Sequence, residues 1–210
     1  MKYVLCILIG YLIGTINPSY IIARLRGFDI REKGSKNAGA SNALILFGKV
    51  IGVGCALLDI AKATFAIWLC GKLFPEIAYS FAVTGVACII GHVFPFYMKF
   101  KGGKGLACLG GMILAFDWRV FLIMLTIEIV VAIVTDYICF VPLTASVIFP
   151  VVYGIMRRDV GGALIVALIL PLMLYKHKEN LRRIKQKTEM PFSFLWNKDK
   201  ALEKTNISQE

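Results

Sequence analysis

The sequence is poor in charged residues and in histidine, and it has little polar chain outside its C-terminal end. Only 18% of the 210 residues are charged and two are histidines, whereas about 25% of the residues of a soluble domain are charged. Hydrophobic residues make up 58% of the chain and collect in long runs. A helix needs about 20 such residues to cross the hydrocarbon core of a bilayer. The composition therefore excludes an ordinary soluble domain and indicates an integral membrane protein.

Paired cysteines are also missing. The sequence has six cysteines but no CxxC motif, and all six lie in or beside apolar runs. This placement argues against a disulfide framework and a metal site, and it favours small buried apolar side chains. We therefore expect no metal and no other cofactor. The cysteines are Cys6, Cys55, Cys70, Cys88, Cys108 and Cys139.

Seven apolar runs predict the fold class. They cover about residues 3–23, 50–70, 78–98, 105–117, 119–135, 138–156 and 160–175. We expect an all-α integral membrane bundle of about seven transmembrane helices, with residues 1–190 as one domain and 191–210 as a cytoplasmic tail. The fourth run is short, which leaves counts of six or five open if short runs are re-entrant. The first run lacks a small-residue cleavage site, so we expect a retained helix and not a signal peptide.

The net charge of +11 is unevenly distributed. If all seven runs cross the membrane, eighteen of the 24 lysines and arginines fall on one side. Loops rich in lysine and arginine stay in the cytoplasm, so we expect the N-terminus outside and the C-terminus inside. The same rule explains the charge better than nucleic-acid binding does, and we expect no nucleic-acid partner. Three basic segments, at residues 31–49, 99–105 and 176–189, then share the cytoplasmic face.

The first basic segment contains a dense group of small polar residues, "GSKNAGASN", at 34–42. Glycine lets a backbone approach a ligand closely, and hydroxyl and amide side chains can hydrogen-bond to it. An alternative explanation is that Ser41 or Asn42 caps the helix that follows. The clustering favours a ligand-binding segment. Its candidate site residues are Ser35, Lys36, Asn37, Gly39, Ser41 and Asn42.

The second basic segment, "KFKGGKG", interrupts two apolar runs. It is not a Walker A loop, because the glycine spacing is wrong and Gly105 replaces the serine or threonine. Its glycines can free backbone N–H groups to line an anion site, at which the next helix also points its positive end. The alternative is a basic turn that orients the protein, but orientation alone requires no glycines. We predict a phosphate site at the membrane surface, formed by Lys101, Gly102, Gly103, Lys104 and Gly105.

The third basic segment directly follows the last apolar run. On a helix, His177 and Asn180 are neighbours one turn apart, and His177 can act as a general base or bind phosphate. Glu179 can orient a basic residue or pair with Arg182 or Arg183. The alternative is a basic helix that lies against anionic lipid.

Ionisable residues within the apolar runs are few. His92 is the only other histidine, and we expect it to face the bundle interior and to hydrogen-bond across helices. Asp59 and Lys62 lie three residues apart in one run and are expected to pair. Glu128 has no evident partner in the sequence.

The motifs "GSKNAGASN", "GHVFPFYMKFKGGKG" and "HKENLRRIKQKTE", in this order, resemble the bacterial acyl-phosphate:glycerol-3-phosphate acyltransferase family (PlsY-type enzymes). The resemblance covers nearly the whole chain. It implies a multi-pass, seven-helix protein of the bacterial cell (inner) membrane with an active site at the cytoplasmic face. It also implies transfer of a fatty acyl group from acyl-phosphate to the sn-1 hydroxyl of glycerol 3-phosphate. The products are lysophosphatidic acid and inorganic phosphate, in the first step of phospholipid synthesis, without a cofactor or an obligate protein partner.

The resemblance also implies roles for individual residues. Catalytic roles are implied for Ser35, Lys104, His177 and Asn180. Supporting roles are implied for His92 and Glu179. Phosphate binding is implied for Asn37, Gly39, Ser41, Asn42, Lys101, Gly102, Gly103 and Gly105, and we add Lys36 to these candidates because of its charge.

Two departures from the family pattern keep other functions open. Ile45 stands where the family commonly has an arginine that binds the anionic substrate, and Lys36 stands where glycine is usual. We hypothesise that Lys36 restores the lost charge. The rival functions are a transporter or flippase for a phosphorylated metabolite or lipid, and an inactive lipid-binding paralogue. Because polar residues crowd at one face and few charges lie within the spans, an interfacial enzyme is favoured.

Overall fold

The long apolar runs form helices because a backbone in hydrocarbon must satisfy its own hydrogen bonds. The computed structural model describes residues 1–195, and every regular element in them is a helix. The bundle helices are α1 (Lys2–Thr15), α4 (Lys49–Leu73), α5 (Ser80–Val93), α6 (Leu106–Phe116), α7 (Trp118–Thr135), α8 (Phe140–Arg157), α9 (Val160–Ala167) and α10 (Ile169–Lys185). The shorter elements are α2 (Pro18–Leu25), η1 (Ile30–Glu32), α3 (Ala40–Phe47), η2 (Phe96–Met98) and η3 (Phe192–Leu195).

Six helical stretches among the described residues are long and apolar enough to cross a membrane. They are Lys2–Leu25, Lys49–Leu73, Ser80–Met98, Trp118–Thr135, Phe140–Arg157 and Val160–Lys185. The expected all-α membrane bundle is thereby confirmed. The fourth predicted run forms α6, which has only 11 residues and is too short to count as a seventh stretch by itself.

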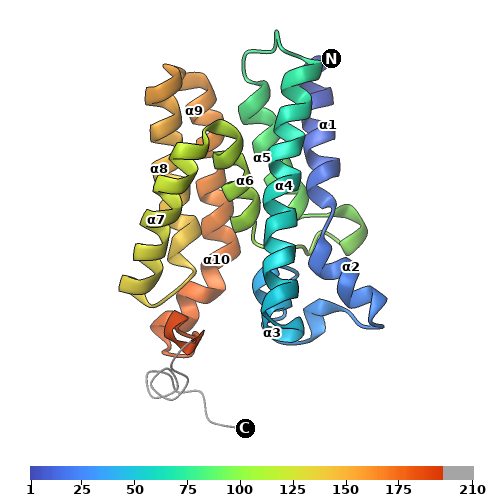
Figure 1. Ribbon diagram of the computed structural model, residues 1–210, viewed down its shortest axis with the longest axis vertical. Coiled ribbons are helices and arrows are strands. Elements are labelled where there is room, and N and C mark those ends of the chain that lie inside the picture. The colour runs from blue at the N-terminus through green and yellow to red at the C-terminus, as the bar shows by residue number, and fades with distance from the viewer. Residues whose placement is uncertain (196–210) are drawn as a thin grey trace.

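The first predicted run is not one continuous helix. It breaks between α1 and α2, because Pro18 has no N–H to continue the hydrogen-bond ladder. The Asn17 side chain caps the new helix by accepting a hydrogen bond from the Tyr20 N–H at 2.9 Å. The break therefore turns α2 away from the axis of α1, as Figure 1 shows.

Helices α1 and α5 pack with very close backbones. A Cβ atom on Gly14 would lie 2.1 Å from the Cys88 carbonyl oxygen, and one on Gly91 would lie 2.2 Å from the Tyr11 carbonyl oxygen. Small residues permit such contacts between membrane helices, where dispersion forces replace the hydrophobic effect as the driving force. This contact fixes the position of α5, whose C-terminal end reaches the basic loops.

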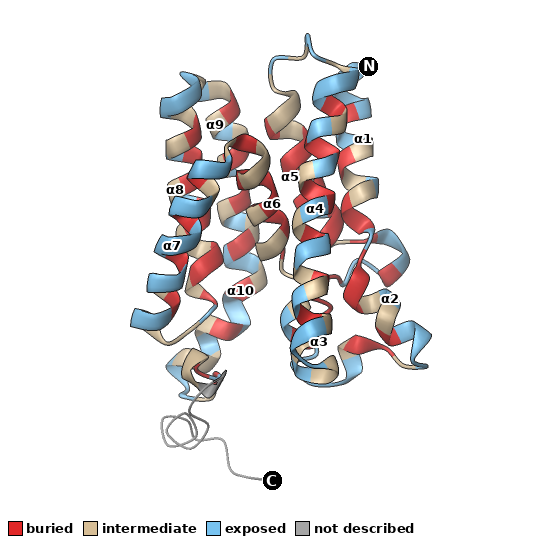
Figure 2. Cartoon of the chain, viewed as in Figure 1, coloured by how far each residue is buried: buried red, intermediate tan, exposed pale blue. Residues whose placement is uncertain are grey.

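The protein core lies between α4, α5, α6, α8 and α10, and it is sealed near one end by aromatic rings. The Phe81 and Tyr153 rings stack with centroids 5.4 Å apart, and Phe116 meets Phe149 edge-on at 5.6 Å. Outward-facing residues on α4 and α7 are exposed although they are apolar, as expected for a surface that contacts lipid (Figure 2).

The two ends of the bundle differ in chemistry. The N-terminus lies at one end, while α2, α3 and the C-terminal end of α10 lie at the other (Figure 1). The three basic segments predicted to share one face are therefore gathered at the same end of the bundle.

Adding one methyl group at Gly14 is expected to destabilise the protein. Gly14→Ala places Cβ against the Cys88 backbone, and overpacking of this kind costs about 1–3 kcal/mol. The matched control is Gly54→Ala on α4, where no atom lies within 4 Å of the new Cβ. Alanine is the better helix former, so the control is expected to gain about 0.5–1 kcal/mol. Melting temperatures in detergent measure both changes, and a Gly14→Ala midpoint at or above the parent value would contradict the packing.

Candidate active site

A basic pocket of about 430 Å³ opens at the end of the bundle where the three segments meet. Its walls come from η1, the loop before α3, the loop after η2, and α10. Five of the lining residues are cations, which suits an anionic ligand. The lining residues are Asp29, Arg31, Glu32, Lys36, Asn37, Lys99, Lys101, Gly102 and Lys176.

The pocket confirms that the three basic segments, far apart in sequence, lie together. Lys36 and Asn37 come from the first segment, Lys101 and Gly102 from the second, and Lys176 from the start of the third. Lys99 and Lys176 begin the second and third basic segments but were not among the candidate site residues, and the structure adds them to the candidate site. Their position in these segments was the signal that could have identified them.

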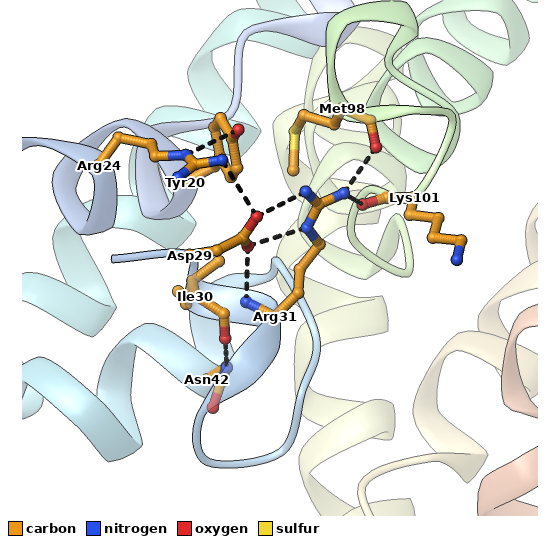
Figure 3. Close-up of polar contacts among 8 residues, drawn as sticks. All are labelled: Tyr20, Arg24, Asp29, Ile30, Arg31, Asn42, Met98 and Lys101. Carbon is orange, nitrogen blue, oxygen red and sulfur yellow. Dashed lines mark hydrogen bonds and ion pairs between the residues drawn. The ribbon is translucent and has the colours of Figure 1, made fainter. Parts of the chain in front are cut away.

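Arg31 and Asp29 hold the first segment against the second (Figure 3). The Arg31 guanidinium donates to both carboxylate oxygens of Asp29, through Nε at 2.9 Å and Nη2 at 2.6 Å. Its remaining nitrogen, Nη1, donates to the Met98 carbonyl oxygen at 2.6 Å and to that of Lys101 at 3.3 Å. One planar side chain thus connects η1 with the loop after η2, a use for which arginine is well suited.

The ion pair is electrostatically strong. The Arg31 hydrogen bonds lower the pKa of Asp29 to about 2, although burial opposes the shift. An aspartate in an unfolded chain has a pKa of about 3.9. The pair therefore stabilises the folded loop above about pH 4, and its contribution is lost as the pH falls toward 2.

Asn42 organises the interior of the first segment. Its Nδ2 donates to the carbonyl oxygens of Ile30, Lys33 and Asn37 at 2.9–3.0 Å, and its Oδ1 accepts from the Ser35 N–H at 2.8 Å. The side chain is fully buried. Asn42 thus shapes the loop that presents the other candidate residues.

The alternative explanation for this segment, that Ser41 or Asn42 caps a helix, is wrong. Gly39 is the N-cap of α3, and Ser41 and Asn42 lie inside the first turn. The Asn42 side chain points into the preceding loop, where it satisfies more backbone groups than a cap could. Ser35 and Ser41 are exposed, and Gly39 is buried.

The glycines of the second segment serve a different purpose from the predicted one. The N–H groups of Gly102 and Gly103 are not free for an anion, because they donate to the carbonyl oxygens of Val93 and His92 at 3.0 and 3.1 Å. Added Cβ atoms would lie 2.1 Å from the His92 carbonyl oxygen at Gly102 and from the His92 ring at Gly103. Gly105 has φ +89° at the start of α6. The loop therefore requires glycines for close seating on α5.

Lys104 and Asn180 belong to a second polar cluster. The Lys104 ammonium donates to Oδ1 of Asn180, and Nδ2 of Asn180 donates to Glu189 at 2.5 Å. The other oxygen of Glu189 accepts from Nε of Arg183 at 2.6 Å. Burial lowers the pKa of Lys104, and the Glu189 charge opposes this effect. Two residues predicted to be catalytic are thus in direct contact.

Glu189 is a candidate site residue that the sequence analysis missed. The sequence assigned a supporting role to Glu179, and its carboxylate pairs with Arg182 at 2.8 Å on the exposed face of α10, which is one of the pairings that the sequence suggested. Glu189 lies beyond the end of α10 and is buried, because the chain turns back there. Ser193 holds this turn by donating its N–H and its hydroxyl to the Asp136 carboxylate at 2.7 and 2.9 Å.

His177 is buried one turn after Met173, and its Nδ1 donates to the Met173 carbonyl oxygen at 2.9 Å. A carbonyl oxygen can only accept, so Nδ1 carries a proton, and in the neutral ring Nε2 keeps its lone pair. His177 and Asn180 lie on one helix, as expected. The histidine can therefore accept a hydrogen bond or a proton at Nε2.

The buried ionisable residues within the spans are paired. His92 contacts Lys62 across helices at 3.0 Å, and Lys62 pairs with Asp59 at 2.6 Å, which confirms both expectations. Glu128, for which the sequence suggested no partner, accepts a hydrogen bond from the Thr144 hydroxyl at 2.6 Å.

Comparison with known proteins gives the family. Residues 4–187 match the family model described as glycerol-3-phosphate acyltransferase. The chain belongs to the glycerol-3-phosphate acyltransferase family. The match spans all three basic segments except the last two residues of the third, so the family assignment includes both the pocket and the Lys104–Asn180 contact.

Relatives in this family align over nearly their whole length. Glycerol-3-phosphate acyltransferase 1 of Oceanobacillus iheyensis is 39% identical over 205 residues, which cover 94% of this chain and 99% of that protein. Glycerol-3-phosphate acyltransferase of Bacillus subtilis is 34% identical, over 93% of this chain and 100% of that protein.

Solved structures in the family have the same fold. The crystal structure of PlsY (YgiH), an integral membrane glycerol 3-phosphate acyltransferase, in its glycerol 3-phosphate form has a TM-score of 0.84 at 29% identity. That alignment covers 93% of this chain and 98% of the other. The lysophosphatidic acid form has a TM-score of 0.82 at 28% identity, over 93% and 97% of the chains.

Replacing Arg31 with lysine is expected to loosen the pocket although the charge is kept. Lysine cannot bond both Asp29 oxygens and two carbonyl oxygens from one plane, so the loss of these bonds should cost about 2–3 kcal/mol. Arg26→Lys is the matched control, because Arg26 is exposed and packs only on the Phe47 ring. Melting temperatures measure the effect, and equal midpoints for the two variants would contradict a clamping role for Arg31.

Proposed function

We propose that this protein transfers a fatty acyl group from acyl-phosphate to the sn-1 hydroxyl of glycerol 3-phosphate, releasing lysophosphatidic acid and inorganic phosphate. The observation that carries the proposal is the basic pocket built from three separated segments. Family membership and the two substrate-related names of the solved relatives support it. Both proposed substrates carry phosphate, and the donor also carries an apolar chain that lipid-facing helices can accommodate.

The chemistry requires positioning more than a dedicated nucleophile. The sn-1 hydroxyl oxygen attacks the acyl carbon, a new ester C–O bond forms, and the C–O bond to phosphate breaks. The leaving phosphate takes the electron pair, and the hydroxyl proton passes to that phosphate or to Nε2 of His177. Acyl-phosphate is already activated, so holding both phosphates and neutralising the departing charge provides most of the catalysis.

The residue roles follow from where each side chain lies. Lys36, Asn37 and Lys101 line the pocket and would bind phosphate. Lys104 and Asn180, in contact with each other, would stabilise the leaving group, with His177 beside them on α10. Ser35 is exposed in the first segment, next to Lys36, and would contact the acceptor. Gly39, Ser41 and Gly105 would act through the backbone geometry of their loops.

We further propose seven membrane crossings, with α6 as the short fourth crossing. An odd number of crossings agrees with the N-terminus and the end of α10 lying at opposite ends of the bundle (Figure 1). The basic end would then face the cytoplasm of a bacterial inner membrane. Residues 1–190 would form the membrane domain and 191–210 a cytoplasmic tail, of which 196–210 lie outside the described residues.

The experiment that tests the function uses the full chain purified in detergent. With a long-chain acyl-phosphate and glycerol 3-phosphate, inorganic phosphate and lysophosphatidic acid should appear in equal amounts, and acyl-CoA should not replace the donor. A transporter would instead move labelled glycerol 3-phosphate into vesicles without any donor. An inactive paralogue would do neither. Phosphate release that does not depend on the acceptor would overturn the proposal.

Lys36 is expected to bind the acceptor phosphate. It has a left-handed backbone, φ +56°, which disfavours lysine, yet its side chain lines the pocket. Lys36→Gly should relieve this strain and leave the melting temperature unchanged or higher. The KM for glycerol 3-phosphate should nevertheless rise about tenfold, which corresponds to about 1.4 kcal/mol.

A matched control exists for the lysine substitution. Lys187 is also an exposed lysine with positive φ, +57°, but it lies outside the pocket, so Lys187→Gly should leave the KM unchanged. Ile45→Arg, on the 60%-exposed position of α3, tests whether an arginine there can replace Lys36. An unchanged KM in Lys36→Gly would show that Lys36 does not supply the missing charge.

A further inference from the structure

Three charged or ionisable side chains meet inside the bundle, away from the pocket. Asp59 and Lys62 lie one turn apart on α4, and His92 lies on α5. The Lys62 Nζ is 2.6 Å from Oδ1 of Asp59 and 3.0 Å from Nδ1 of His92, and all three residues are at least nine-tenths buried. Charges buried in a membrane protein are costly, and they usually have a functional reason.

The third partner of Lys62 explains part of that reason. The ammonium also donates to the Ile16 carbonyl oxygen, at the break between α1 and α2. In an unbroken helix this oxygen would accept from the Tyr20 N–H, but that group is bonded to the Asn17 side chain. Lys62 therefore satisfies a carbonyl oxygen that the break has left without its helical partner, and its ammonium also contacts Asp59 and His92.

The contact of Lys62 with the Ile16 carbonyl oxygen leads to the segment 34–42. Asn17, the residue after Ile16, is fully buried, and its Nδ2 donates to the Ala38 carbonyl oxygen at 2.8 Å. Ala38 lies in the segment 34–42, between the candidate residues Asn37 and Gly39. The position of the helix break is thus transmitted directly to the first half of the proposed site.

The contact of Lys62 with His92 leads to the second basic segment, residues 99–105. Nδ1 of His92 faces Lys62, while the Gly103 backbone lies so close to the other ring nitrogen that a Cβ would be 2.1 Å from it. The His92 carbonyl oxygen accepts the Gly103 N–H at 3.1 Å. Lys104 follows immediately and contacts Asn180. The orientation of His92 therefore determines where the second half of the site lies.

A metal ion is an alternative occupant of this cluster. The potential ligand atoms of Asp59, His92 and Cys108 all lie within 4.8 Å of one another. The Lys62 ammonium, however, already bonds Asp59 and His92 and balances the carboxylate charge. The donor set is thus organised around an internal cation supplied by the chain itself.

We propose that Lys62 is a positioning residue that holds the two halves of the active site in register from within the membrane. It fixes the helix break that carries the segment 34–42 and the histidine that carries the loop 99–105. The proposal adds a residue remote from the substrates to the machinery of the reaction. Its catalytic consequence rests on the proposed function, whereas its geometric consequence does not.

The test requires removal of the whole buried pair. Lys62→Met alone would leave the buried carboxylate of Asp59 unpaired, and this unpaired charge would by itself destabilise the fold. Asp59→Leu/Lys62→Met replaces both side chains with apolar ones of similar size. The matched control is Glu128→Met/Thr144→Val, which removes a buried polar pair on α7 and α8 that has no hydrogen bond to the basic segments among the described residues.

The first measurement compares turnover at matched stability. Phosphate release per folded molecule should fall at least tenfold in Asp59→Leu/Lys62→Met and stay within twofold of the parent in the control. This difference should remain when the melting temperatures of both variants fall by the same amount. Equal turnover in the two variants would overturn the proposal, because Lys62 would then act on stability alone.

The second measurement does not depend on activity. Spin labels are attached to cysteines introduced at Glu32 and Lys101, which line the pocket from the two halves. The six native cysteines are buried, so labelling is selective. Dipolar broadening between the labels should become weaker and more heterogeneous in Asp59→Leu/Lys62→Met and stay unchanged in the control. An unchanged spectrum in the test variant would overturn the proposal.

The two measurements separate this proposal from the proposed function. If the parent protein releases no phosphate but the broadening changes in the variant, the proposed enzyme function is wrong and the positioning role is supported. If the parent protein is active but the broadening does not change, the enzyme function is supported and the positioning role is wrong. If the first variant does not fold, Asp59→Asn/Lys62→Gln, which retains the polar volume without charge, is measured by the same criteria.

Discussion

The site depends on the bidentate contact between Arg31 and Asp29. Five cations line one pocket, and like charges in close proximity repel each other. The loops that carry them need an attachment that does not use the lysines themselves. Arg31 provides it, because one side of its guanidinium is neutralised by Asp29 and the other reaches the backbone of the loop after η2. The attachment therefore leaves the four lysines that line the pocket without a role in joining the loops.

Close backbone packing is the second constraint, and the site needs it in addition to the contact between Arg31 and Asp29. Gly14 and Gly91 bring α1 against α5, and Gly102 and Gly103 bring the second basic loop against the end of α5. Helix α5 is thus a rigid base on which the loop is placed, and α4 supports it through Lys62. The irregular backbone at Gly102 and Gly103 is satisfied by hydrogen bonds to α5, as a membrane environment requires.

Much of the fold and the general location of the candidate site could be predicted from the sequence. The apolar runs marked the helices, and the lysines and glycines marked the three segments. What could not be predicted was which atoms those residues would use. Gly102 and Gly103 indicated free N–H groups, whereas both groups bond α5. The sequence analysis considered Glu179 and did not consider Glu189, because Glu189 lies beyond the end of α10 and only the turn after this helix brings it to Asn180.

The contact between Asn180 and Glu189 has a consequence for how this sequence can diverge. Two contacts hold the last turn of α10 and the turn beyond it together. Glu189 bonds Asn180 on the helix, and Ser193 bonds Asp136 at the end of α7. Inserting or deleting one residue within the last turn of α10 would rotate the residues that follow by about 100° about the helix axis. Drift in this stretch should therefore proceed by substitution and not by change of length, even though it reads as an ordinary polar tail.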